Sequence, residues 1–78
     1  MTLMSTGTGL AGYKILLYAQ ETGGWVAEMP AIPGCHALME SPGEALLELE
    51  KVFEMIREEY EEAGKPLPED RTELLVNA

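Results

Sequence analysis

Cys35 and His36 are the residues best suited to chemistry, because they hold the only thiol and the only imidazole of the chain. A neighbouring imidazole can activate a thiol as a nucleophile, so the pair is a candidate for a hydrolytic site. The two residues are adjacent in a strand-like segment, however, and successive side chains of a strand point to opposite faces. The sequence therefore predicts a packed thiol and a separate histidine. A small hydrolase that uses either residue remains only a third alternative.

Other kinds of site find equally little support in the sequence. Phosphodiester cleavage with paired metal ions needs several converging carboxylates, yet Asp70 is the only aspartate and Tyr13–Gln20, the expected central strand, contains no carboxylate. One cysteine and one histidine are too few for a closed zinc site. Gly7, Gly9 and Gly12 have the spacing of a dinucleotide-binding loop, but a strand-like run follows them where that loop requires a helix. We therefore expect no enzyme, no metal and no cofactor.

The charge balance of the chain is strongly acidic. Its 78 residues include 14 acidic and 5 basic side chains, which gives a formal net charge of −9. Such a surface repels phosphates, so we expect no direct nucleic-acid binding, and instead a basic partner or high solubility. No segment approaches the ~18 consecutive apolar residues of a membrane span, so we expect no membrane contact. The single cysteine excludes an internal disulfide and fits a reducing, cytoplasmic location.

The chain begins with a segment that lacks an apolar pattern and continues as one domain. Residues 1–12 predict a flexible leader, and residues 13–78 predict a single domain. Apolar side chains alternate along Tyr13–Gln20 and Trp25–Met29, on either side of a turn at Gly23-Gly24. This pattern indicates an antiparallel hairpin. The first strand has apolar residues on both faces, so we expect it to be covered on both sides.

Two further strands are expected after the hairpin. Pro30, Pro33 and Gly34 impose a fixed bend, and Cys35–Glu40 follows as a short third strand. Thr72–Val76 predicts a last strand. The expected fold class is α+β, a two-layer sandwich of order β-β-β-α-β. In it, the last strand lies beside the first strand of a three-stranded antiparallel meander, and one long helix covers one face.

The helix has clear signals at both ends. Ser41 is expected to cap its first turn, Pro42 to occupy the first helical position, and Glu44 to complete a capping box. Gly64 supplies the left-handed stop. Between these ends, apolar residues recur at helical spacing: Ala45, Leu46, Leu49, Val52, Phe53, Ile56, Tyr60 and Ala63.

The outer face of this helix carries an unbroken row of like charges. Glu50, Glu54, Glu58 and Glu62 are spaced four residues apart, and each such pair costs an isolated helix about 0.2–0.5 kcal/mol. Stability alone would not select this arrangement. It indicates either a solvated face that keeps the chain soluble or a docking surface for a basic protein.

Five short motifs share an order and a spacing that point to a family. They are Tyr13–Leu17, Gly23–Glu28, Met29–Cys35, Glu44–Leu46 and Glu62–Pro68. Together they cover roughly residues 12–70 and resemble the HicB-like antitoxin domain. The third motif is close to the P-x-L-P-G-C sequence of that family. Met39–Pro42 stands where the family has a Gly-Asp-Thr turn before its helix, although Ser41 keeps the capping role.

The resemblance implies a partial ribonuclease-H-like fold and an inhibitory function. Such a protein would bind and neutralise a small basic HicA-type toxin that cleaves messenger RNA, without being an enzyme itself. Many family members also carry a C-terminal DNA-binding domain, for which we expect no room in a chain that ends at Ala78. The alternative is an oligomeric adaptor of the same fold with no toxin partner.

The expected partner contacts lie near the Pro30–Gly34 bend. They are Glu28 and Glu40, whose carboxylates suit a basic partner, with Trp25 and His36 as anchors. Trp25 is better suited to the core of so small a domain than to a partner contact. A thin core and open sheet edges further predict self-association, as a dimer or a tetramer.

Overall fold

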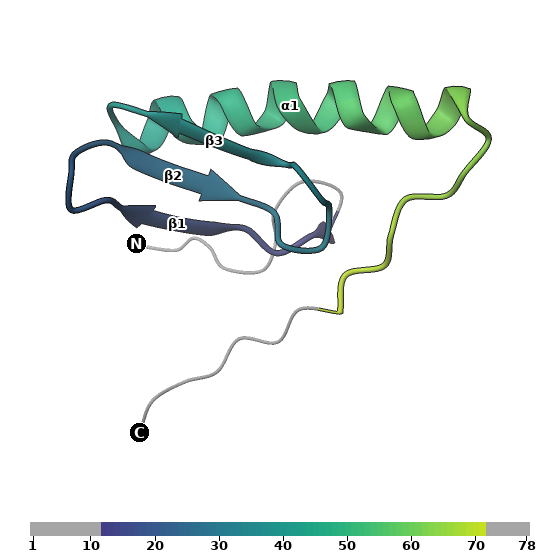
Figure 1. The fold of residues 1–78 in the computed structure, drawn as a ribbon, viewed down its shortest axis with the longest axis horizontal. Coiled ribbons are helices and arrows are strands. Elements are labelled where there is room, and N and C mark those ends of the chain that lie inside the picture. The colour runs from purple at the N-terminus through teal and green to yellow at the C-terminus, as the bar shows by residue number, and fades with distance from the viewer. Residues whose placement is uncertain (1–11, 72–78) are drawn as a thin grey trace.

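The computed structural model describes residues 12–71 and has an α+β architecture (Figure 1). Its elements are, in order, β1 (Leu16–Ala19), β2 (Trp25–Glu28), β3 (His36–Met39) and α1 (Pro42–Glu62). The strands form one antiparallel sheet in the order β1-β2-β3. This confirms the predicted meander followed by one long helix. The predicted last strand, Thr72–Val76, and the leader except Gly12 lie outside the described residues.

The β1–β2 hairpin is closed by a glycine turn, as its sequence predicts. The Gln20 amide donates to the Gly24 carbonyl at 2.9 Å, and the Gly23 amide donates to the Gln20 carbonyl at 3.1 Å. Gly24 has a φ of +90°, and a Cβ there would lie 3.0 Å from Leu38 Cδ1 and 3.2 Å from the Met39 carbonyl oxygen. Both the backbone conformation and the space therefore require glycine at this position.

The bend at Pro30–Gly34 places one apolar side chain in the core. The Met29 amide donates to the Cys35 carbonyl at 2.9 Å, and the Ile32 amide donates back to the Met29 carbonyl at 3.0 Å. Gly34 adopts a φ of +79°. Ile32, at the tip of the bend, is only 2% exposed. The two prolines and the glycine thus act as a rigid turn that holds Ile32 under the helix.

The helix begins and ends at the predicted residues. The Glu44 amide donates to Ser41 Oγ at 3.2 Å, and Pro42 is the first helical residue. The Ser41 hydroxyl also donates to Glu44 Oε1 at 3.0 Å, so the carboxylate accepts from the side chain of the cap. At the other end Ala63 is the C-cap, and Gly64 follows with a φ of +69°.

The core lies between α1 and the two strands that the helix packs against, β2 and β3. Its buried residues are all apolar and include Ala27 and Ala37 of the sheet and Ala45, Leu49 and Phe53 of the helix. Alanine at the two sheet positions lets the helix approach the strands closely. The tight packing of such interiors makes the volume of each side chain matter.

One expectation for the first strand is wrong. Tyr13–Gln20 was expected to be covered on both faces, but Leu17 is 39% exposed and Tyr18 is 44% exposed. Leu17 lies on the helix side and is exposed because α1 touches β1 least. Tyr18 lies on the opposite face of the sheet, which α1 does not cover. Only four residues, Leu16–Ala19, form the strand. In the described sheet β2 is the middle strand, and the strand expected to make β1 central lies outside the described residues.

The segment after α1 returns to the start of β1 (Figure 1). The hydroxyl of Tyr13 donates to the carbonyl of Pro68. The amide of Lys14 donates to Asp70 Oδ2 at 2.7 Å, and Lys14 Nζ lies 3.6 Å from the same oxygen. This clamp fixes the chain beside β1 up to the last described residues.

The helix cap offers a direct test of the local interactions. Replacing Ser41 by alanine removes the acceptor for the Glu44 amide and should lower the free energy of unfolding by about 1 kcal/mol. Urea denaturation followed by circular dichroism measures this change. S41N is the matched control, because asparagine caps as well as serine, and it should unfold close to the native chain. Equal destabilisation of both variants would contradict the capping role.

Candidate functional site

The four residues predicted to contact a partner do not form one cluster. Glu28 and His36 are direct partners in the β2–β3 register, so their side chains share the sheet face turned away from α1. Trp25 lies on the helix side and is partly buried against the core. Glu40 is exposed just after β3. The structure therefore brings Glu28 and His36 together, whereas Trp25 packs against the core.

Glu28 is engaged by a residue that the sequence did not single out. The Tyr18 hydroxyl donates to Glu28 Oε1 at 2.9 Å. This hydrogen bond, with burial and the charge of the carboxylate, raises the pKa of Tyr18, because ionising the phenol would set two negative groups side by side. Tyr18 could have been found by extending the predicted hairpin register, which places it on the same face as Glu28.

A second acidic position lies at the other end of β3. Glu40 and Glu44 line an open hollow together with Leu38, Met39 and the glycine turn Gly23-Gly24. Glu44 was predicted only as a capping residue, and its carboxylate also accepts from Ser41. Two carboxylates at one rim suit the ammonium or guanidinium group of a basic protein.

The outer face of α1 carries most of the charge. It presents eight glutamates along the helix: Glu44, Glu48, Glu50, Glu54, Glu58, Glu59, Glu61 and Glu62. The last turn of the helix contains no basic residue. This acidic face, defined as the exposed carboxylates from Glu50 to Glu62, is the strongest electrostatic feature of the described residues.

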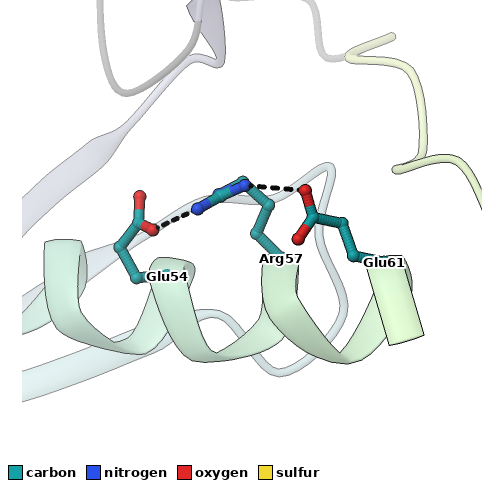
Figure 2. A network of polar contacts seen from close by, with 3 residues as sticks. All are labelled: Glu54, Arg57 and Glu61. Carbon is teal, nitrogen blue, oxygen red and sulfur yellow. Dashed lines mark hydrogen bonds and ion pairs between the residues drawn. The ribbon is translucent and has the colours of Figure 1, made fainter. Parts of the chain in front are cut away.

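Arg57 is neutralised within that face (Figure 2). Its Nη2 atom lies 2.7 Å from Glu54 Oε1, and its Nη1 atom lies 3.2 Å from Glu61 Oε2. The hydrogen bond to Glu54, followed by the charges of Glu54 and Glu61, raises the pKa of Arg57. Arg57 is thus occupied on both sides, and the other basic residue of α1 is the exposed Lys51.

Cys35 and His36 diverge as predicted. The Cys35 side chain is buried, and burial raises the pKa of its thiol, which keeps it protonated and a poor nucleophile. His36 is exposed on the opposite face of the sheet. Within residues 12–71, no group of three or more histidine, cysteine, aspartate or glutamate side chains is arranged to hold a metal ion. Across the same residues, no helix has the length and apolar character needed to cross a membrane.

Comparison with known proteins does not assign a family. No protein-family model, no curated protein and no solved structure matches the chain.

The Tyr18–Glu28 contact predicts a specific titration behaviour. Replacing Glu28 by glutamine removes the carboxylate charge and should lower the pKa of Tyr18 toward its ordinary value. NMR of ring-labelled tyrosine measures this directly. E59Q, which removes an exposed carboxylate on the helix instead, is the control and should leave Tyr18 unchanged.

The same contact has a consequence for stability against pH. A raised pKa in the folded state stabilises the protein below the pKa of the unfolded tyrosine, and this contribution is lost as the pH rises through the folded value. The native chain should therefore lose more stability than E28Q across that alkaline range, as measured by urea denaturation at a series of pH values. An identical pH dependence of the two proteins would contradict the contact.

Proposed function

We propose that this chain is a HicB-like, antitoxin-like binding protein, without enzymatic activity, that neutralises a small basic HicA-type ribonuclease in the cytoplasm. The observation that carries the proposal is the acidic face of α1, where glutamates at every fourth position from Glu50 to Glu62 are exposed. A ribonuclease that binds messenger RNA needs a positive surface to contact the phosphates. An acidic face, which has the opposite charge, can cover that surface.

The repulsion between the carboxylates of the acidic face lowers the stability of the helix, which indicates that the face serves a function other than stability. Carboxylates four residues apart repel each other by about 0.2–0.5 kcal/mol per pair, and the end of a helix favours cations where this one has Glu58, Glu59, Glu61 and Glu62. Binding a basic protein would relieve this repulsion. The same complementarity would speed the encounter of the two proteins and make it sensitive to salt.

The hollow at Glu40 and Glu44 is the second contact that we assign to the basic partner. Both carboxylates lie near the start of α1, so they extend the acidic surface beyond the row that begins at Glu50. Trp25, packed against the core, serves the fold in this proposal.

We also propose that a fourth strand completes the sheet. We place Thr72–Val76 as a last strand beside β1, which would give the two-layer β-β-β-α-β fold of a partial ribonuclease-H-like domain. The Lys14–Asp70 clamp supports this placement, because it brings the chain alongside β1 two residues before that segment begins.

One observation favours a second candidate function, an oligomeric adaptor with no toxin partner. The sheet face turned away from α1 exposes apolar side chains, with Leu38 54% exposed. Exposed apolar patches of this kind mark interaction surfaces in other proteins.

Charge removal on the acidic face tests the antitoxin proposal. The tagged chain should capture a small basic protein at low salt, release it at high salt, and inhibit the RNA cleavage of the freed protein. The double variant E50Q/E58Q should bind that protein roughly tenfold more weakly, as measured by calorimetry, because two complementary charges are lost. Loss of fold cannot explain this result, since removing like charges should stabilise the helix.

The matched control removes the same charge elsewhere. E21Q/E69Q neutralises two exposed carboxylates outside the helix and should keep the native affinity. An equal loss of affinity in both double variants would show that only the net charge of the chain matters, and not the position of the carboxylates. Absence of any salt-released basic ribonuclease would contradict the antitoxin function and favour the adaptor.

A further inference from the structure

Two apolar side chains lie on the outer side of α1, among its carboxylates. Leu47 is 62% exposed and Met55 is 60% exposed, more than any other large apolar residue that the structure describes. Residues four apart on a helix are neighbours on its surface, so Leu47, Lys51 and Met55 form one row over two turns. This row is the outer ridge of α1. The buried residues Leu49 and Phe53 lie on the opposite side, toward the sheet.

Carboxylates border the outer ridge on both sides. Glu50, Glu54 and Glu58 each follow a residue of the ridge by three positions, so the acidic face runs along one border. Glu44 and Glu48 each precede a residue of the ridge by three positions and form the other border. An apolar centre with a polar rim is the usual anatomy of a protein interface. Here the rim carries one sign of charge.

Helix stability does not require apolar residues in the outer ridge. Glutamine and lysine form helices nearly as well as leucine and methionine, so helix propensity is satisfied without Leu47 or Met55. One exposed apolar side chain is ordinary on a protein surface. Two that are aligned on one helix and enclosed by carboxylates indicate a contact with another molecule.

We propose that the outer ridge binds an amphipathic helix of the basic partner, with an apolar stripe between lysine or arginine side chains. This inference rests on the proposed function and names the part of that partner which α1 receives. The carboxylates on both borders select its chemistry, because they attract lysine and arginine and repel an acidic helix, including a second copy of α1. Leu47 and Met55 contact the apolar stripe, and the flexible thioether of Met55 adapts to its shape.

Lys51 is the one residue of the outer ridge whose charge opposes a basic partner. A lysine can lay its aliphatic stem along an apolar surface while its ammonium group stays in water. The stem of Lys51 can therefore continue the apolar surface between Leu47 and Met55, while the ammonium repels the cations of the partner. Removing that charge should strengthen binding.

The first experiment uses two synthetic peptides of identical composition. One is a helix-forming peptide of leucine, alanine, lysine and arginine whose leucines share one face, and the other has the same residues in an order that spreads the leucines around the helix. Fluorescence anisotropy of a trace of labelled peptide, titrated with the purified full chain at low salt, measures both dissociation constants. The native chain should bind the amphipathic peptide at least about tenfold more tightly, because only that peptide buries an apolar stripe.

The matched variants remove the apolar side chains without changing any charge. L47Q/M55Q should bind the amphipathic peptide at least about tenfold more weakly than the native chain and bind the scrambled peptide equally well. L17Q is the control, because Leu17 is exposed on β1 and lies outside the outer ridge. It should keep the native affinity for both peptides. Circular dichroism verifies that each variant keeps its fold.

A second pair of variants tests for a gain of affinity. K51Q and K51M both remove the positive charge of Lys51, and only K51M extends the apolar surface. K51Q should strengthen the binding of both peptides to a similar degree. K51M should bind the amphipathic peptide more tightly than K51Q does, and the scrambled peptide no more tightly. A loss of fold would not produce stronger binding.

Three results would overturn the proposal: equal affinity of the native chain for the two peptides, unchanged affinity of L47Q/M55Q for the amphipathic peptide, or equal affinities of K51M and K51Q for it. The peptides make this test independent of any captured ribonuclease. Peptide binding as expected without a captured ribonuclease would support the outer ridge as a docking surface and contradict the antitoxin function. A captured ribonuclease that binds L47Q/M55Q as tightly as the native chain would support that function and overturn the role of the ridge.

Discussion

A single helix has to cover a three-stranded sheet, and the other features of this protein follow from that constraint. A helix is about 10 Å across and strands are spaced about 4.8 Å apart, so one helix covers about two strands. Here α1 packs on β2 and β3, where Ala27 and Ala37 allow close approach. Leu17 of the first strand lies on the helix side and stays exposed as a result. The sheet also retains one face that the helix does not reach.

The two exposed surfaces differ in chemistry. The acidic face of α1 presents carboxylates with Arg57 already occupied by Glu54 and Glu61. The sheet face turned away from α1 exposes Tyr18 and Leu38. It also carries one carboxylate, Glu28, and one imidazole, His36. A strongly charged surface favours a partner of opposite charge. Leu38 connects the two regions, because it also lines the hollow with Glu40 and Glu44.

Interactions between residues close in the chain could be predicted from the sequence. The position of the helix over the strands could not. The Ser41 cap, Pro42 at the first helical position, the Gly64 stop and the Pro30–Gly34 bend depend on residues close in the chain, and all were found at the expected places. The coverage of β1 was wrong, because apolar periodicity does not say which strands a helix lies over. The predicted contacts near the bend separated because side chains alternate along β2: Glu28 shares a register position with His36, while Trp25 faces the helix.

The clamp between the start of β1 and the segment after α1 sets the order in which the chain is expected to assemble. The strand pairs and the helix join residues close in sequence, whereas Lys14 bonds to Asp70 across 56 residues. Contacts of low sequence separation form early in folding, and the closure of a long loop follows. We expect the clamp to open while the helix and sheet stay packed, so that the Lys14 amide exchanges its hydrogen through local opening and the core amides exchange only on global unfolding.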